Sequence, residues 1–272
     1  MLAISIAATA AAQPEHRLDV DDPILEVAFL AVALDSGTEW TGTPMGGDED
    51  ALDVRRPPFS TFKIPNLLIA LDTGAARALD HEIAWDPARR PAAAHWPDDW
   101  ARDQTLASAF RRSAVWYFQD LAEEVGGPRY RERLAAFAYG NASAPDGSDT
   151  FWLDGTLRIS VREQVDFLAA LLRGDLPVSD HAFDALREAA RLGERGEYRL
   201  YGKTGAGPVA PGDFDGAFRG WLVGWIEAPD RAPAVYALFV VGPDWRSIAR
   251  FRREEAERLL AAAGLWPGHG ED

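Results

Sequence analysis

The sequence predicts a mixed α/β fold in which strands lie near both ends of the chain and helices fill the middle. Three observations support this class: strand-like apolar segments, a long stretch with helical periodicity, and an amphipathic segment from Ser247 to Ala263 that predicts a closing helix. The segments with strand character are Leu25 to Ala33, Thr38 to Thr41, the residues around Lys203, Gly220 to Trp225 and Ala234 to Val241.

The first two strands flank Asp35-Ser36-Gly37, residues that favour a tight turn. Met45 to Arg56 is bracketed by prolines and glycines, so we expect a loop there. The last strand, Ala234 to Val241, is a continuous apolar run, which suits a buried central position in a sheet.

From Gly74 to about Gly196 the periodicity is mostly helical, as in Arg162 to Leu172 and Phe183 to Leu192. Thr105 to Asp120 is also predicted to be one partly buried helical segment, because its apolar residues fall at helical spacing: Leu106, Phe110, Val115 and Phe118.

Composition narrows the class of protein. The 272 residues are 47% hydrophobic and include ten tryptophans, enough for a large core in one folding unit or two interleaved subdomains. The chain has no cysteine, which excludes disulfides, thiolate catalysis and cysteine-ligated metal. A formal charge of −15 argues against nucleic-acid binding. Neither a metal site nor a Ser-His-Asp site is predicted, because the histidines are scattered: His16, His81, His95, His181 and His269.

Ser60-Thr61-Phe62-Lys63 places a hydroxyl and an amine three residues apart where a helix is expected to begin. Pro65 lacks an N–H, which limits regular helix upstream of it, and Gly74 is a natural helix stop. Ser60 and Lys63 therefore share one face of the opening turn. A serine becomes nucleophilic when a base takes its proton, and lysine is such a base only when burial lowers its pKa.

Two further motifs carry polar chemistry. Lys203-Thr204-Gly205 predicts a strand edge whose cation and hydroxyl hold a substrate carboxylate, with Gly205 leaving room for a ligand. The alternative is an ordinary strand end with a solvated lysine. Ser113, in Ser113-Ala114-Val115, is a candidate proton relay beside Ser60, the alternative being a capping or surface serine.

The order of these motifs resembles the penicillin-recognising serine enzymes and most closely the class D β-lactamases, the oxacillinase family. Longer strings carry the resemblance, which covers the chain from about Leu25 to its end: 58–66 (PFSTFKIPN), 139–141 (YGN), 151–155 (FWLDG), 157–160 (LRIS) and 220–225 (GWLVGW). It implies an antiparallel sheet flanked by N- and C-terminal helices, with an all-helical subdomain, about residues 74–196, inserted between strands. Residues 13–272 would form this single domain.

The resemblance also implies a chemistry. Carbon dioxide would carboxylate Lys63 in a dry pocket lined by Phe62, Val115, Trp152 and Leu153, and the Trp152 indole N–H would donate to the carbamate. Ser60 would attack the β-lactam carbonyl and water would hydrolyse the acyl-enzyme, with carboxylated Lys63 as the base in both steps.

The resemblance assigns the remaining site residues. The N–H groups of Ser60 and Ala206 would hold the oxyanion, while Ser113 and Lys203 would assist proton transfer. Arg252 would bind the substrate carboxylate, although three other arginines compete for that role. The expected substrate-binding residues are thus Val115, Thr204, Gly205, Ala206 and Arg252, and the competing arginines are Arg246, Arg250 and Arg253.

Asp86 to Asp103 matches no string of the family, and residues there and after the Ser113 motif are expected to line the pocket mouth: His95, Trp96, Trp100, Trp116 and Tyr117. The expected ligand is a small-molecule β-lactam, with no metal and no cofactor beyond the carbamate. Two alternatives acylate without turnover: a penicillin-binding D,D-peptidase and a β-lactam sensor domain. The sequence leaves the oligomeric state open.

The N-terminal stretch Leu2 to Ala12 is apolar and alanine-rich, and Ala8-Thr9-Ala10 fits an A-x-A cleavage site. Residues 1–12 are therefore predicted to be a signal-peptide remnant, although a basic leader region is missing, and the alternative is a simple tail. A periplasmic or secreted location follows from this prediction. No apolar run reaches the length of a membrane span.

Overall fold

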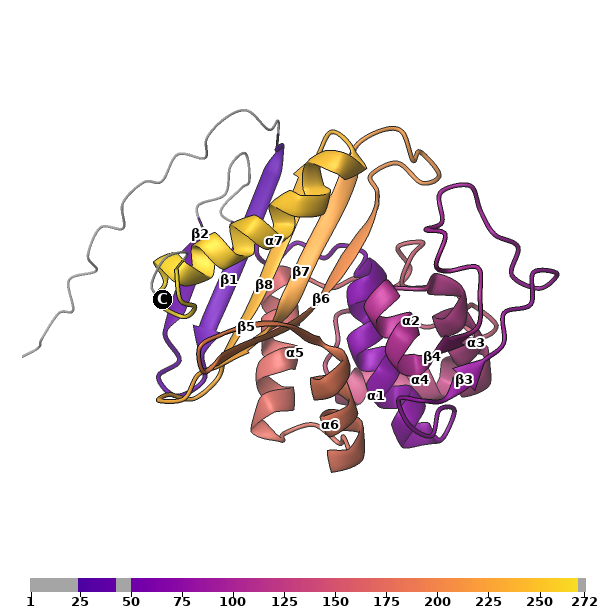
Figure 1. Cartoon of the computed structure of the whole chain (residues 1–272), viewed down its shortest axis with the longest axis horizontal. Coiled ribbons are helices and arrows are strands. Elements are labelled where there is room, and N and C mark those ends of the chain that lie inside the picture. Colours follow the sequence, from indigo (N-terminus) through magenta and orange to yellow (C-terminus); the bar gives the residue numbers. More distant parts are fainter. Residues whose placement is uncertain (1–23, 43–49, 269–272) are drawn as a thin grey trace, which may run out of the picture.

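The structure, a computed structural model, describes residues 24–42 and 50–268, so the predicted signal-peptide remnant lies outside the described part of the chain. The predicted class is confirmed. A six-stranded antiparallel sheet, in the order β2-β1-β8-β7-β6-β5, has helices packed on both faces (Figure 1). Its strands are β1 (Glu26–Ala33), β2 (Glu39–Gly42), β5 (Arg191–Arg195), β6 (Tyr198–Pro208), β7 (Phe218–Glu227) and β8 (Ala234–Gly242).

A second sheet contains only β3 (Glu82–Ile83) and β4 (Gln104–Thr105). The helices are the short 3-10 helix η1 (Phe59–Phe62), α1 (Lys63–Thr73), α2 (Leu106–Arg112), α3 (Val115–Val125), α4 (Gly127–Ala136), α5 (Val161–Arg173), α6 (Asp180–Ala189) and α7 (Trp245–Ala262).

An apolar layer covers each face of the sheet and separates it from the helices packed there. Strand β7 shows the separation: Trp221 and Val223 pack into the core shared with α1 and α5, whereas Leu222 packs on the opposite face with Ile248 of α7. Successive side chains of a strand point to opposite faces, so one strand serves both layers. The apolar run Ala234 to Val241 lies in β8, between β1 and β7, which confirms the predicted central strand.

Local sequence signals explain several helix ends. Gly74, with a φ of 80°, ends α1 as predicted, because glycine adopts the left-handed conformation without steric cost. Ser160 begins α5, where its hydroxyl accepts from the Glu163 amide and the Glu163 carboxylate accepts from the Ser160 amide.

Two helix predictions are wrong in their extent. Thr105 to Asp120 is not one helix, because the chain leaves α2 at Ser113, whose φ is 64°, before α3 begins at Val115. The segment Phe183 to Leu192 overruns α6, which ends at Ala189. Arg191 and Leu192 belong instead to β5, where backbone pairing with β6 overrides the helical periodicity.

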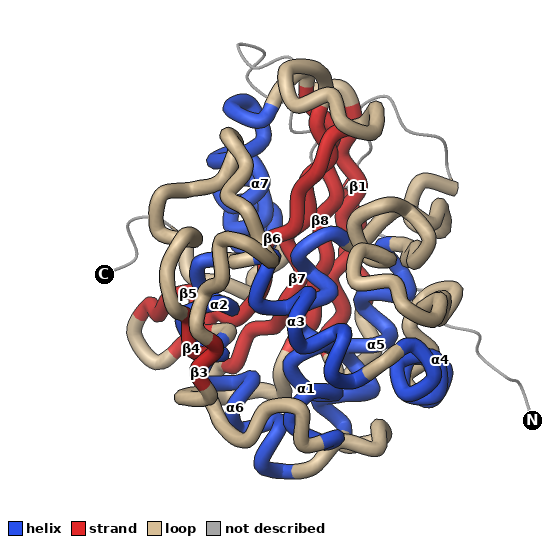
Figure 2. Tube along the Cα trace, turned by 90° about the vertical axis from the view of Figure 1, so that its right-hand side faces the viewer, coloured by secondary structure: helices blue, strands red, loops and turns tan. Residues whose placement is uncertain are grey.

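One edge of β6 is left partly unpaired, and this edge positions the site. Strand β5 pairs only with Tyr198 to Tyr201, so the part of β6 from Lys203 to Pro208 has a neighbouring strand, β7, on one side only. Helix η1 packs against β6, and α1, α2 and α3 lie beyond this edge (Figures 1 and 2).

Candidate active site

Ser60 and Lys63 lie on adjoining helices, Ser60 in η1 and Lys63 at the first position of α1. The structure brings their side chains together: Lys63 Nζ and Ser60 Oγ are hydrogen-bonded at 2.8 Å. Lys63 is fully buried, and Ser60 is 9% exposed. Ser60 and Lys63 therefore share one face, as predicted. The buried Lys63 amine contacts the hydroxyl of Ser60, a residue that keeps some exposure to solvent.

The turn before Ser60 is held in an uncommon conformation. Phe59 has a φ of 49°, in the left-handed region that side chains other than glycine rarely adopt. Its amide donates to the carbonyl of Trp152 at 3.1 Å, and Thr61 Oγ1 donates to the carbonyl of Pro58 at 2.8 Å. Gln164 of α5 supports the same turn, donating to Thr61 Oγ1 at 3.0 Å.

Burial lowers the pKa of Lys63 well below its usual range, and the nearby Lys203 cation lowers it further. The apolar surroundings include the Phe118 ring, whose centroid lies 5.1 Å from Lys63 Nζ. The rings of Phe62 and Trp152 stack with centroids 5.2 Å apart. The site therefore favours the neutral amine, as predicted for a lysine that acts as a base.

Ser113 and Lys203 also meet. Lys203 Nζ donates to Ser113 Oγ at 3.0 Å and to the carbonyl of Thr204 at 3.0 Å. Burial, followed by repulsion from Arg252, lowers the pKa of Lys203 to about 7. The left-handed conformation of Ser113, at the end of α2, presents its hydroxyl to β6.

The structure distinguishes Arg252 from the neighbouring arginines on α7. Arg252 is 8% exposed, and its Nη1 donates to the Gly205 carbonyl at 3.1 Å. Burial lowers the pKa of Arg252 to about 10. The three competing side chains are exposed: Arg246, Arg250 and Arg253. Arg252 is therefore the member of this group that reaches the Lys203-Thr204-Gly205 strand.

The backbone of β6 also contributes to the site. The Gly202 amide donates to the Ala190 carbonyl, away from β7. Because amides alternate in direction along a strand, the Ala206 amide points to this same edge, beyond the reach of β5. Ser60 lies in the first helical turn, where amides have no intrahelical partner. These are the two amides expected to form the oxyanion hole.

Gly205 has a structural role in addition to the predicted one. A Cβ atom there would lie 2.7 Å from the Pro58 carbonyl oxygen and 3.0 Å from the Thr61 amide nitrogen. The chain's own turn around Ser60 therefore packs closely against Gly205. Gly207 is similar, since its Cβ would lie 2.1 Å from the Phe59 ring.

We expect Gly205→Ala to lower the free energy of unfolding by about 1–3 kcal/mol, because the added methyl group forces β6 away from η1. The rate of acylation at Ser60 should fall with it. Thermal unfolding and labelling by a fluorescent penicillin would measure both quantities. Gly268→Ala, at a glycine with nothing within 4 Å of the added Cβ and no left-handed φ, is the comparison for loss of a glycine alone; equal acylation rates in both variants would contradict this role of Gly205.

The predicted pocket-mouth residues separate into two groups. Trp116 and Tyr117 are fully buried, so their placement at the mouth is wrong. Their polar atoms donate to backbone carbonyls, Trp116 Nε1 to Trp100 at 2.8 Å and the Tyr117 hydroxyl to His81 at 2.7 Å. By contrast, the exposed His95 stacks on Phe214, with centroids 4.1 Å apart.

Sequence reasoning missed several residues that support the site. Helical periodicity marks Phe118 as a core residue, which carries no signal of its contact with Lys63. Thr61 and Gln164 are 103 residues apart, so only folding reveals their hydrogen bond. Phe214 lies in the loop between β6 and β7, where no motif drew attention to it.

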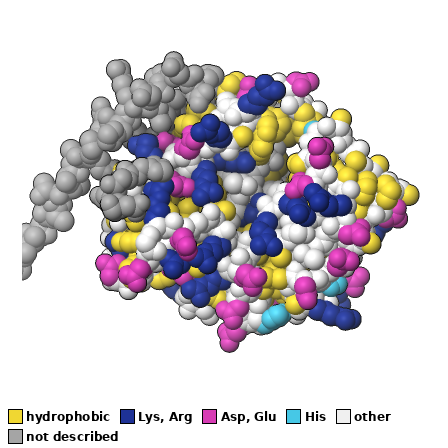
Figure 3. Space-filling view, in the orientation of Figure 1, with side chains coloured by type: hydrophobic (Ala, Val, Ile, Leu, Met, Phe, Trp, Pro, Cys, Tyr) yellow, Lys and Arg dark blue, Asp and Glu magenta, His cyan; other side chains and the backbone are white. Residues whose placement is uncertain are grey.

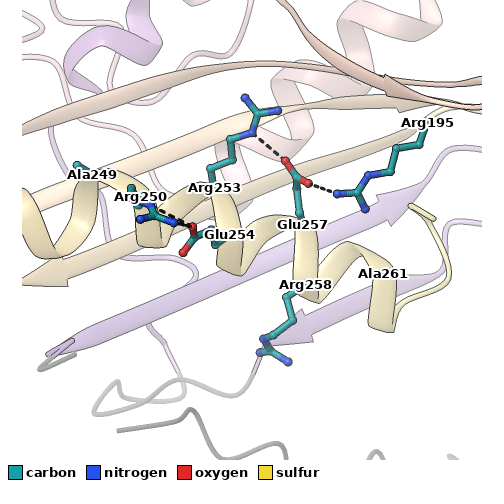
Figure 4. A pocket seen from close by; sticks show the side chains of 8 residues that line it. All are labelled: Arg195, Ala249, Arg250, Arg253, Glu254, Glu257, Arg258 and Ala261. Atoms are coloured by element: carbon teal, nitrogen blue, oxygen red, sulfur yellow. Dashed lines mark hydrogen bonds and ion pairs between the residues drawn. The ribbon is translucent and has the colours of Figure 1, made fainter. Parts of the chain in front are cut away.

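A separate groove runs along the outer face of α7 (Figure 4). Its arginines are joined to glutamates, as in the contacts of Glu257 with Arg253 and Arg195 at 2.8 Å each. None of the groove residues belongs to the Ser60 site. Among residues 24–42 and 50–268, the structure contains neither a cluster of His, Asp or Glu able to hold a metal nor a helix long and apolar enough to cross a membrane.

The fold and this arrangement of serine and lysines define a penicillin-recognising serine enzyme. The family model for the penicillin-binding protein transpeptidase domain matches residues 38–256. β-Lactamase OXA-20 of Pseudomonas aeruginosa is 34% identical over 236 residues, covering 87% of this chain and 83% of the relative. β-Lactamase OXA-10 of the same organism is 40% identical over 211 residues, covering 78% and 76%.

Solved structures agree with these sequence matches. The class D β-lactamase YbXI from Nostoc has a TM-score of 0.78 and 28% identity, covering 89% of this chain and 95% of that one. FUS-1 (OXA-85), a class D β-lactamase from Fusobacterium nucleatum subsp. polymorphum, has a TM-score of 0.76 at 28% identity, covering 89% and 93%. The chain belongs to the class D β-lactamase family, which confirms the resemblance inferred from its motifs.

Proposed function

We propose that this protein hydrolyses β-lactam antibiotics through an acyl-enzyme on Ser60, with carboxylated Lys63 as the general base. The observation that carries the proposal is the buried Lys63 amine, hydrogen-bonded to Ser60 Oγ and held in apolar surroundings that favour its neutral form. A neutral amine is the form that reacts with carbon dioxide, releasing one proton as the carbamate forms.

The surroundings of Lys63 fit a carbamate. The Trp152 indole N–H is buried and has no hydrogen-bond partner among residues 24–42 and 50–268, while its ring stacks on Phe62, the residue before Lys63. A buried donor without a partner is costly, and an acceptor from a carboxylated Lys63 would remove that cost. The carbamate would supply an anionic base beside the Ser60 hydroxyl.

In the first step, the Ser60 hydroxyl loses its proton to this base and Oγ bonds to the lactam carbonyl carbon. The carbon–nitrogen bond of the ring then breaks, and the ring nitrogen takes a proton by way of Ser113 and Lys203, which are hydrogen-bonded at 3.0 Å. In the second step, water loses a proton to the base, attacks the ester carbon and releases Ser60. The amides of Ser60 and Ala206 stabilise the oxyanion in both steps.

Local charge allows an acidic protein to bind an anionic substrate. The net charge of the chain is −15, but the site gathers Lys203 and Arg252, whose pKa values are lowered by burial and, for Lys203, by the arginine. Within the described part of the chain, no carboxylate is among the causes that shift these two pKa values. Acidic side chains are instead scattered over the face of the molecule shown in Figure 3. We propose that Arg252 and Thr204 hold the substrate carboxylate, with Val115 and Gly205 beside the bound drug.

The proposal is tested by steady-state hydrolysis of a chromogenic cephalosporin with and without added bicarbonate, using Ser60→Ala for the background rate. Turnover that rises with bicarbonate is the expected result. A single stoichiometric burst that ignores bicarbonate would overturn it in favour of a D,D-peptidase or a sensor domain.

The modification should depend on pH in a defined direction. Burial lowers the pKa of Lys63, so its amine is neutral at a lower pH than a solvated lysine and becomes protonated as the pH falls through that lowered value. Because the protonated amine cannot react with carbon dioxide, we expect a carbamate signal from ¹³C-bicarbonate at pH 7.5 that disappears reversibly on acidification. Carbon NMR measures it. A signal that persists in Lys63→Met would assign it to another amine.

We further propose that the enzyme acts in the periplasm or outside the cell. The alanine-rich stretch Leu2 to Ala12, with its A-x-A pattern, supports export. Fractionation of cells that express the full gene tests this location.

A further inference from the structure

Four aromatic side chains form a continuous row at one end of the sheet. His95 stacks on Phe214 with centroids 4.1 Å apart and planes 15° from parallel. Phe214 lies 6.3 Å from Phe218, and Phe218 lies 6.0 Å from Trp245. We call these four residues the aromatic row. They come from the segment 86–103, the β6–β7 loop, the start of β7 and the start of α7.

The row ends at the residue proposed to bind the substrate carboxylate. The Arg252 guanidinium carbon lies 4.9 Å from the centre of the Trp245 ring, and Arg252 Nη1 donates to the Gly205 carbonyl. Phe218 pairs with Pro208, three residues beyond Gly205 on β6. Trp245 is therefore the ring of the row nearest to Arg252, the proposed binding site of the substrate carboxylate. Phe214 and His95 lie farther from Arg252 along the row.

The row is partly open to solvent. Phe214 is 46% exposed and Trp245 is 43% exposed, which places them among the four most exposed large apolar side chains of the described residues. His95 is exposed as well. Exposed rings that contact one another gain little from burial, but their faces can stack on a ligand.

We propose that the aromatic row binds a flat aromatic substituent that a β-lactam carries on the ring atom next to its carboxylate-bearing carbon. The inference depends on the proposed function, because Arg252 must hold the carboxylate. With the carboxylate fixed there, a neighbouring substituent is directed past the exposed Trp245 ring towards Phe214, while Phe218, 6% exposed, supports both rings from below. Stacking between aromatic groups contributes about 0.5–1.5 kcal/mol, which corresponds to about a two- to thirteenfold change in rate at low substrate concentration.

Two cephalosporins with the same acyl side chain test this inference, one with a methyl group and one with a styryl group at the position next to the carboxylate-bearing carbon. In Phe214→Ala, kcat/KM for the styryl compound should fall about two- to thirteenfold, while kcat/KM for the methyl compound should change less than twofold. Phe214→Tyr keeps the ring and should keep the preference. Phe214 suits the test because Trp245 and Phe218 separate it from Arg252.

Val54→Ala is the matched control, since Val54 is also 46% exposed but lies outside the row. It should leave the ratio of the two kcat/KM values unchanged. Equal losses for both substrates in Phe214→Ala, or no loss for either, would overturn the inference. Failure of the proposed function looks different, because the unaltered protein would then turn over neither compound.

Discussion

Replacing Lys63 with methionine is expected to lower turnover of β-lactams about 10³- to 10⁴-fold, because it removes the general base from both steps. Lys63 Nζ is the group hydrogen-bonded to the Ser60 hydroxyl, at 2.8 Å. Any acyl-enzyme that still forms should persist, since water lacks its base. Steady-state kinetics and intact-protein mass spectrometry after exposure to a penicillin measure both effects.

The same substitution should not unfold the protein. Lys63 is fully buried, and burial lowers its pKa, so keeping its polar amine in the site costs folding free energy. Methionine has a similar length but no amine, and it avoids this cost. We expect a melting temperature equal to or above that of the unaltered protein. A melting temperature that falls in step with activity would show that Lys63 acts mainly through folding. Added bicarbonate should restore no activity to this variant.

Replacing Trp152 with phenylalanine is expected to lower turnover about 10²-fold at ambient carbon dioxide, because the proposed carbamate loses its indole donor. The indole N–H is buried and has no partner in the described part of the chain, whereas the ring packs on Phe62 and Phe151. Phenylalanine keeps much of that packing. Added bicarbonate should recover part of the activity by mass action, which a titration of rate against bicarbonate would measure.

Trp116→Phe provides the matched control. Trp116 is also fully buried, but its indole N–H donates to the Trp100 carbonyl, outside the Ser60 site. Both substitutions should lower the free energy of unfolding by similar amounts, on the order of 1–3 kcal/mol, through the cavity left by the smaller ring. Only Trp152→Phe should change the response to bicarbonate. An equal response in the two variants would remove the special role of Trp152.

Much of the site was predictable because its residues lie in short, recognisable strings. Ser60 and Lys63 are three residues apart, so helical geometry alone brings them onto one face. Lys203 lies in a strand whose apolar neighbours mark it as such. Lys203 and Ser113 are 90 residues apart in the sequence. Their contact was predicted from the resemblance to the family and not from the residues around either of them.

Other features could not be predicted from periodicity. Trp116 and Tyr117 come directly after the Ser113-Ala114-Val115 motif. Their burial depends on the segment 86–103 and on His81, whose backbone carbonyls accept their hydrogen bonds. The break at Ser113 interrupts an otherwise helical pattern because the chain takes a left-handed residue there. The extent of β5 depends on its pairing with β6.

The sequence by itself determined the family, the mixed α/β class, the central position of β8 and the order of the candidate catalytic motifs. Each of these features follows from short runs of adjacent residues or from simple hydrophobic periodicity. Only the tertiary structure decided that Lys63 is fully buried, that Arg252 reaches Gly205 while its neighbours face solvent, and that Phe214 meets His95. The physical reason is that burial and hydrogen bonding are set by groups distant in sequence, which come together only when the sheet and helices pack.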